Sequence, residues 1–266
     1  MKINEIEILT GGNVNDSIEK IGETIYRPQS NEYLHEFLKY MESAGFTGIP
    51  RFLGKDDRQR EILSFLPGDV VGNRFPNCQA YIWSDDNLVR IARFIRDYHD
   101  VSMGFVNQAR KLGWQNAMFA KEDQVAICHN DAAPYNFVYQ EERFVGMIDF
   151  DTAYPAPRLW DLAYTLYTTI PLASFQPCLD QTTRPYLSSD ALIRKQRIQL
   201  FFEAYQLDIP DDLFTWVEQR LQALCKLILT EAKAGNIAFQ RMLEQGEVDY
   251  YLNEIKFIKE NAKDWR

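Results

Sequence analysis

Cysteine is scarce in this sequence. Its four cysteines, Cys78, Cys128, Cys178 and Cys225, lie far apart, and no C-x-x-C pair occurs. Zinc sites of the finger type and the disulfide frameworks of small secreted proteins need cysteines at characteristic spacings, so neither is indicated. This cysteine usage favours a reducing compartment, and we expect a cytoplasmic protein.

Long apolar runs are also missing. Met1 to Thr10 alternates apolar and charged residues, unlike the uninterrupted apolar segment of a secretory leader. A helix that crosses a bilayer needs about 20 predominantly apolar residues, and no stretch of this kind occurs. We find no internal repeat and no low-complexity tail. The sequence therefore predicts a protein without a membrane partner.

Basic residues are outnumbered, with 29 Lys and Arg against 38 Asp and Glu and a formal net charge of -9. This balance argues against a nucleic-acid partner, because a phosphate backbone would be repelled, and it slightly favours a cationic small molecule. What the sequence does contain is 46% hydrophobic and 14% aromatic residues in 266 positions. That is enough for a sizeable core, in one large domain or in two lobes that share a cleft.

One segment, from Cys128 to Asp151, concentrates residues suited to chemistry. It reads CHNDAAPYNFVYQEERFVGMIDFD, and the apolar runs 125–128 and 144–148 predict short buried strands on either side of its polar residues. Asp131, Asn136 and Asp149 supply the hard oxygen ligands that Mg²⁺ prefers, and phosphoryl transfer also needs a carboxylate that orients the accepting hydroxyl. Any one of them alone would be interpreted as a turn residue bonded to nearby backbone. Their order and spacing together indicate a site for Mg²⁺ and a phosphoryl group.

The order His129-x-Asp131, then Asn136, then Ile148-Asp149-Phe150-Asp151 resembles the catalytic and metal-binding loops of the aminoglycoside phosphotransferase and choline kinase family. The resemblance implies an α+β, two-lobed protein-kinase-like fold, with a small N-terminal antiparallel sheet lobe and a larger, mainly helical C-terminal lobe. It also implies that Asp131 orients the substrate hydroxyl, that Asn136 and Asp149 hold Mg²⁺, and that His129 is a scaffold residue.

Two positions depart from the sequence patterns of this family and of the protein kinases. Asn130 stands where the family usually carries glycine, and Asp151 stands where protein kinases place a glycine. Asn tolerates a left-handed backbone better than most residues, so Asn130 is expected to preserve the turn and to add a side chain near the substrate. Asp151 is ordinary for small-molecule kinases of the family.

The N-terminal part predicts a small sheet with one helix. Strands are expected from Ile3 to Ile8 and over 24–26, with a turn at 11–16 between them, and the apolar spacing over 31–44 predicts a helix. A kinase fold would place its phosphate-covering loop at that turn. The glycines Gly11 and Gly12 also fit a plain hairpin turn, because the G-x-G-x-x-G spacing is absent.

At the end of the predicted strand, Arg27 is the residue available to grip the nucleotide phosphates, where the family usually has lysine. Arginine can bind phosphate oxygens in a bidentate way. The alternative is a surface charge ahead of Pro28. Glu32 or Glu36 in the following helix is a candidate partner for Arg27, and either also fits a solvent-facing position.

Residues 50–68 resemble the hinge between the lobes of the same family. Extended backbone at such a hinge can offer N–H and C=O groups to a purine edge, so Ser64, Phe65 and Leu66 are candidate base contacts. A simple edge strand that ends at Pro67-Gly68 is the competing interpretation. The predicted division is a nucleotide-binding lobe with hinge, 1–68, and a catalytic and substrate-binding lobe, 69–266.

Helical patterns dominate the chain after residue 68. They cover 85–100, a stretch that begins at 159, and the segments 191–205, 211–234 and 248–262. The resemblance gives Asp161 a structural role in holding loops near the site. Trp216, Leu221, Leu224, Leu227 and Ile228 are expected in the core.

Together these features predict a phosphotransferase that moves the terminal phosphoryl of ATP or GTP to a hydroxyl of a small molecule, with Mg²⁺ as cofactor. A cationic aminoglycoside, which would make the protein an antibiotic-resistance enzyme, is favoured slightly over choline-like, sugar or amino-alcohol acceptors. The alternatives are a nucleotide-binding pseudokinase without transfer activity and a helical interaction module. The oligomeric state is left open by the sequence.

Overall fold

The structure of the protein is a computed structural model, and it describes residues 6–9, 18–28, 31–72, 80–178, 180 and 182–266. The predicted turn at 11–16 with Gly11 and Gly12, the start of the predicted first strand at Ile3, and Cys78 lie outside these residues. Cys128, Cys178 and Cys225 are free thiols. No helix within the described ranges is both long enough and apolar enough to cross a membrane.

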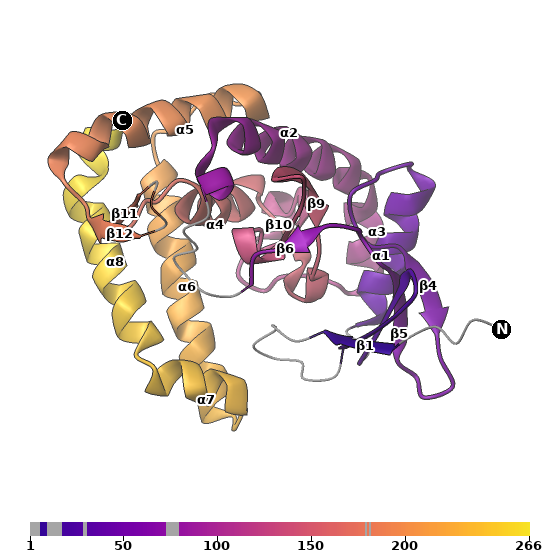
Figure 1. The fold of residues 1–266 in the computed structure, drawn as a ribbon. Coiled ribbons are helices and arrows are strands. Elements are labelled where there is room, and N and C mark those ends of the chain that lie inside the picture. Colours follow the sequence, from indigo (N-terminus) through magenta and orange to yellow (C-terminus); the bar gives the residue numbers. More distant parts are fainter. Residues whose placement is uncertain (1–5, 10–17, 29–30, 73–79, 179, 181) are drawn as a thin grey trace. The chain divides into compact units, whose positions relative to one another are not determined.

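The N-terminal part of the chain forms an antiparallel sheet, as predicted (Figure 1). Its spatial order is β1 (Ile6–Leu9), β2 (Ile18–Ile21), β3 (Thr24–Arg27), β5 (Glu61–Ser64) and β4 (Phe52–Lys55). Helix α1 (Glu32–Ser43) connects β3 to β4, and Asn31 caps it by accepting a hydrogen bond from the amide of Leu34 at 2.7 Å. The apolar stripe of α1 is buried, and Phe37 contacts the ring of Phe105 with 5.5 Å between centroids.

The predicted catalytic segment forms three short strands and two 3₁₀ turns. Strand β7 (Ala126–Cys128) pairs with β10 (Tyr154–Ala156), and β8 (Phe137–Gln140) lies between β6 (Asp69–Val70) and β9 (Arg143–Met147). The 3₁₀ turns are η4 (Pro134–Asn136) and η5 (Phe150–Thr152). Strand β8 was not predicted, because its apolar residues follow the polar ones without a turn signal between them.

Helix α2 (Asp85–Ser102), predicted over 85–100, packs against this segment through its C-terminal half. Tyr98 contacts the ring of Phe150 with 5.9 Å between centroids, and the hydroxyl of Ser102 accepts a hydrogen bond from the amide of Ile127 at 3.2 Å. Both contacts are buried, so the catalytic segment rests on a rigid element. This is what a precisely arranged polar site requires.

The remaining elements are mainly helical. They are α3 (Val106–Leu112), α4 (Arg158–Thr169), β11 (Phe175–Pro177), β12 (Thr183–Pro185), α5 (Ala191–Tyr205), α6 (Leu213–Lys233), α7 (Ile237–Glu244) and α8 (Glu247–Asn261), with 3₁₀ turns η1 (Ala80–Trp83), η2 (Met103–Phe105), η3 (Lys121–Asp123), η6 (Ser188–Asp190) and η7 (Ala262–Trp265). Leu221 and Ile228 of α6 are buried as predicted, whereas Leu227 is 43% exposed, so its assignment to the core is wrong. The α+β class with an N-terminal antiparallel sheet and a mainly helical remainder is confirmed.

The chain forms two compact units, one made of residues 1–75 and 94–158 and the other of residues 76–93 and 159–266. All of the predicted site residues belong to the first unit. The predicted lobes, 1–68 and 69–266, are a division by role in the reaction. The two compact units do not test a division by role, so the boundary at residue 68 stays a prediction.

Candidate functional site

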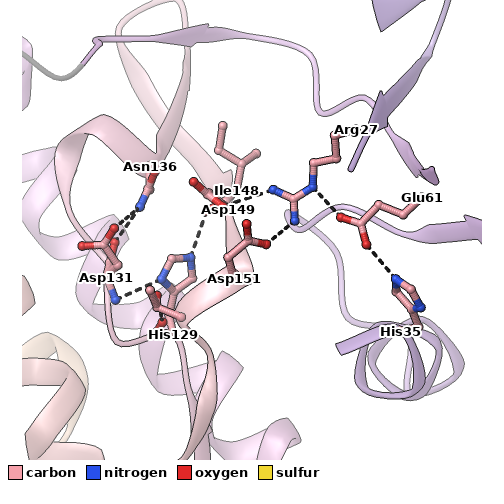
Figure 2. A network of polar contacts seen from close by, with 10 residues as sticks. Arg27, His35, Glu61, His129, Asp131, Asn136, Ile148, Asp149 and Asp151 are labelled. Atoms are coloured by element: carbon pink, nitrogen blue, oxygen red, sulfur yellow. Dashed lines mark hydrogen bonds and ion pairs between the residues drawn. The ribbon is translucent and has the colours of Figure 1, made fainter. Parts of the chain in front are cut away.

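The candidate site is built around Asp131, which follows β7. Its carboxylate accepts a hydrogen bond from the hydroxyl of Tyr135 at 2.6 Å and another from Nδ2 of Asn136 at 2.9 Å. The same Nδ2 atom also donates to the backbone oxygen of Asp131 at 2.9 Å (Figure 2). The Asp131 carboxylate is therefore held in one orientation from both of its oxygens.

His129 connects this loop to the segment that carries Asp149. Its Nδ1 accepts a hydrogen bond from the amide of Asp131 at 3.2 Å, and its Nε2 donates to the backbone oxygen of Ile148 at 2.9 Å. The amide of Ile148 in turn donates to the backbone oxygen of Asn136 at 2.9 Å. His129 is fully buried, so it acts as a link between loops, in agreement with its predicted scaffold role.

Two residues of the site have a left-handed backbone. Asn130 has φ 64° and Asp149 has φ 63°, a conformation that costs most L-residues roughly 1–2 kcal/mol but that Asn and Asp tolerate. The predicted turn at Asn130 is thus confirmed. Its side chain, however, is buried and donates to the backbone oxygens of Cys128 and Thr152, at 2.9 and 3.0 Å, so it braces two loops from inside.

Arg27 reaches the same site from the end of β3. It is only 5% exposed, so the surface-charge alternative is wrong. Its Nε donates to Glu61 at 2.5 Å, its Nη1 contacts Asp149 at 3.2 Å, and its Nη2 contacts Asp151 (Figure 2). Burial alone would lower the pKa of the Arg27 guanidinium, but the nearby carboxylates of Asp151, Glu61 and Asp149 raise that pKa above its ordinary value.

The partner of Arg27 within the N-terminal sheet is therefore Glu61 of β5. Of the two helix residues considered from the sequence, Glu32 lies 3.8 Å from the ammonium of Lys55 and Glu36 lies 2.8 Å from that of Lys39. Both are exposed, and neither pairs with Arg27. Glu61 was missed because its place opposite Arg27 follows from the β3–β5 register, which the sequence does not reveal.

The predicted base-contact segment lies at the end of β5. The amide of Ser64 donates to the backbone oxygen of Arg51, and the amide of Phe65 donates to that of Glu23, each at 2.9 Å. These two N–H groups already have acceptors. A base at this edge would thus use carbonyl oxygens or the amide of Leu66.

The fold is that of protein-kinase-like phosphotransferases. The GDP complex of wild-type aminoglycoside 2'-phosphotransferase-IIIa superposes with a TM-score of 0.55 at 14% identity, over 99% of this chain and 94% of that one. Choline kinase from Cryptosporidium parvum Iowa II gives a TM-score of 0.53 at 10% identity, over 98% and 90% of the two chains.

A family model described as the phosphotransferase enzyme family (APH) matches residues 32–194. This is more than half of the sequence, and the chain belongs to this family. It is also 27% identical over 213 residues to the trifolitoxin immunity protein of Rhizobium leguminosarum bv. trifolii, which covers 77% of this chain and 76% of that protein.

Proposed function

We propose that the protein is a small-molecule kinase that transfers the terminal phosphoryl of ATP or GTP to a hydroxyl group. The observation that carries this proposal is the meeting of Arg27 with Asp149, two residues 122 positions apart in the sequence. This contact places a guanidinium, a group that binds phosphate well, beside a carboxylate of the predicted metal site. Membership of a phosphotransferase family supports the reaction class.

Asp131 is the residue to which we assign the accepting hydroxyl. A carboxylate held by Tyr135 and Asn136 can accept or orient the hydroxyl proton without first having to search for its rotamer. Such proton transfer or orientation contributes typically 10²–10⁴-fold to a rate. The amide of Asp131 donates to Nδ1 of His129, and Nε2 of the same ring donates to the backbone oxygen of Ile148, so His129 connects the Asp131 loop to the Asp149 segment.

Asn136 and Asp149 are the residues that would hold Mg²⁺. Because Nδ2 of Asn136 donates twice to Asp131, the Oδ1 atom of Asn136 faces away from Asp131. No donor among the described residues contacts this oxygen, so it is available as a metal ligand. The Asp149 side chain is 50% exposed. Three carboxylates surround the single guanidinium of Arg27, and this excess of negative charge fits a divalent cation. When bound, Mg²⁺ would neutralise charge on the transferred phosphoryl group.

Arg27 is assigned to the nucleotide phosphates. Nη1 and Nη2 each carry two hydrogens and each makes one described contact, which leaves an N–H on both for phosphate oxygens. Ser64, Phe65 and Leu66 are assigned to the base through their backbone, with the amides of Ser64 and Phe65 excluded by their sheet contacts.

The acceptor is proposed to be a small hydroxylated compound. A net charge of -9 favours a cationic acceptor over a neutral one. The relative named for immunity to trifolitoxin supports an acceptor that harms the cell, such as an antibiotic, over a choline, sugar or amino-alcohol metabolite. Expression of the gene in a sensitive host, with growth measured against a panel of aminoglycosides and other antibiotics, separates the two. The low cysteine content supports a cytoplasmic location.

The test of the reaction is turnover of ATP and GTP with a panel of hydroxylated amines. We expect Asp131→Ala and Asp149→Ala each to lower the rate by at least about 100-fold. Asp57→Ala, which alters an exposed carboxylate in the β4–β5 turn, should retain the wild-type turnover rate. Full activity in both site variants would overturn the assignment.

A nucleotide-binding pseudokinase is the second candidate. Its support is Arg27 itself, which stands where the family usually has lysine. Thermal shift with nucleotide, with and without Mg²⁺, distinguishes the two when combined with the turnover assay. Binding without transfer or hydrolysis would favour the pseudokinase.

A further inference from the structure

A buried chain of polar contacts connects helix α1 to Arg27. Oε1 of Glu61 accepts the Nε–H of Arg27 at 2.5 Å, and Oε2 of the same carboxylate lies 2.6 Å from Nε2 of His35 (Figure 2). Glu61 is 0% exposed, His35 4% and Arg27 5%. Each carboxylate oxygen of Glu61 thus has its own partner, one from a strand and one from a helix.

Local structure explains how the three residues meet. Arg27 and Glu61 are direct partners in the antiparallel β3–β5 register, so their side chains leave the same face of the sheet. His35 lies on the buried face of α1, and its ring stacks on Phe52 of β4 with 4.0 Å between centroids and 15° between planes. The imidazole is therefore fixed by packing as well as by its hydrogen bond.

The Nε contact decides how the guanidinium is presented. A guanidinium is planar, so fixing Nε on one carboxylate also fixes the direction of its two terminal nitrogens. In this protein they point toward Asp149 and Asp151. Without Glu61 the guanidinium would lose the contact that fixes its Nε atom, and without His35 the Glu61 carboxylate would lose one of the contacts that orient it.

We propose that Glu61 and His35 are positioning residues for the nucleotide phosphates, acting through Arg27. This inference rests on the proposed function, because it assigns them a purpose only if Arg27 binds nucleotide. On this proposal helix α1 contributes to the nucleotide site through Glu61, although no hydrogen bond or ion pair between α1 and Arg27 occurs among the described residues.

The first test measures binding of the Mg²⁺ complexes of non-hydrolysable ATP and GTP analogues by calorimetry. We expect Glu61→Gln to weaken binding by about tenfold or more and His35→Leu by about threefold to tenfold, since each removes one charge-assisted contact. His35→Gln keeps an N–H donor toward Glu61 and should restore most of the affinity. Glu36→Gln, next to His35 but exposed and paired with Lys39, is the matched control and should bind like wild type.

The second test separates positioning from general stability. In an Arg27→Gln background the His35→Leu change should have little further effect on affinity, because its route to the phosphates is gone. An equal loss in both backgrounds would overturn the inference, as would wild-type affinity in Glu61→Gln. Thermal unfolding without nucleotide identifies variants that fail to fold, and His35→Gln and Glu61→Gln then decide the outcome. A wild-type protein that binds neither analogue would overturn the proposed function itself, and the inference with it.

Discussion

Asn136 donates twice to Asp131 through a single nitrogen, once to the carboxylate and once to the backbone oxygen, each at 2.9 Å. The two bonds fix which end of the Asn136 amide faces Asp131. Its oxygen is consequently presented on the other side, so one side chain can orient the carboxylate and also serve as a metal ligand. If Asn136 has this proposed double use, an amide suits position 136 better than a carboxylate, which has no hydrogen to donate when ionised.

Replacement of Asn136 should therefore be costly for catalysis. We expect Asn136→Leu to reduce turnover by at least about 100-fold, because it removes both the bond to Asp131 and the proposed Mg²⁺ ligand. Tyr135→Phe removes only the hydroxyl that donates to Asp131 at 2.6 Å, and should reduce turnover by less than about tenfold. Steady-state kinetics at several Mg²⁺ concentrations measure both, and equal effects of the two changes would contradict the dual role of Asn136.

Loss of His129 should destabilise the protein as well as inactivate it. His129→Leu leaves the amide of Asp131 and the carbonyl of Ile148 without the ring atoms that they now contact, at about 1–3 kcal/mol for each buried group. Urea unfolding monitored by tryptophan fluorescence gives the change in free energy. His129→Gln, which keeps one donor, is expected to lose less, and a His129→Leu protein as stable as wild type would refute the linking role.

Gly68 is expected to be intolerant of any side chain. A Cβ atom there would lie 2.5 Å from Cγ1 of Val138 and 2.6 Å from the backbone oxygen of Tyr139, and φ is 141°. Overpacking of this kind costs about 1–3 kcal/mol before any backbone strain is counted. Gly72→Ala is the matched control, because Gly72 also has positive φ, at 69°, but open space around it. The melting temperature should fall clearly more for Gly68→Ala than for Gly72→Ala, and the reverse order would be inconsistent with the close approach of β8.

Glu254 of α8 gives a prediction about pH. Burial raises the pKa of its carboxyl above the ordinary value of 4.5, although the amide and hydroxyl of Ser174 donate to it and Arg194 is nearby. The folded state thus holds this proton more tightly than the unfolded chain, and the contribution of Glu254 to stability declines as the pH rises from about 4.5 through the folded-state pKa.

Glu254→Gln abolishes this titration. The melting temperature of the variant minus that of wild type should therefore increase as the pH rises over this window. Differential scanning fluorimetry from pH 4 to 8 measures this difference. A difference that decreases with rising pH would contradict the prediction, because it would mean that the folded state favours the ionised carboxylate.

The helices and the order of the candidate site residues could be predicted from the sequence, because both depend on local information. The spacing of apolar residues predicted α1 to within one residue at each end, and the predicted range 191–205 coincides with α5. The segment from His129 to Asp151 was recognisable because its residues lie within one short stretch.

Contacts between distant segments were not accessible in the same way. The pairing of Arg27 with Glu61 depends on strand register, and its contact with Asp149 depends on how a strand of the N-terminal sheet meets a loop 122 residues later. A helix residue was a reasonable partner from sequence distance alone, since Glu32 and Glu36 are nearer in the chain. Tertiary packing, which places His35 rather than these carboxylates on the buried face of α1, decided otherwise.

The inward-facing side chain of Asn130 constrains what can replace it. Its left-handed backbone would suit glycine, the residue usual in the family, yet the amide nitrogen supplies donors to two carbonyls, those of Cys128 and Thr152. Replacement of Asn130 by glycine would relieve the backbone strain but would remove the hydrogen bonds that connect the end of β7, at Cys128, to η5, at Thr152. In this chain the side chain at position 130 hydrogen-bonds two separate segments, so exchange of the loop with that of a relative would need the compensating contacts to be transferred as well.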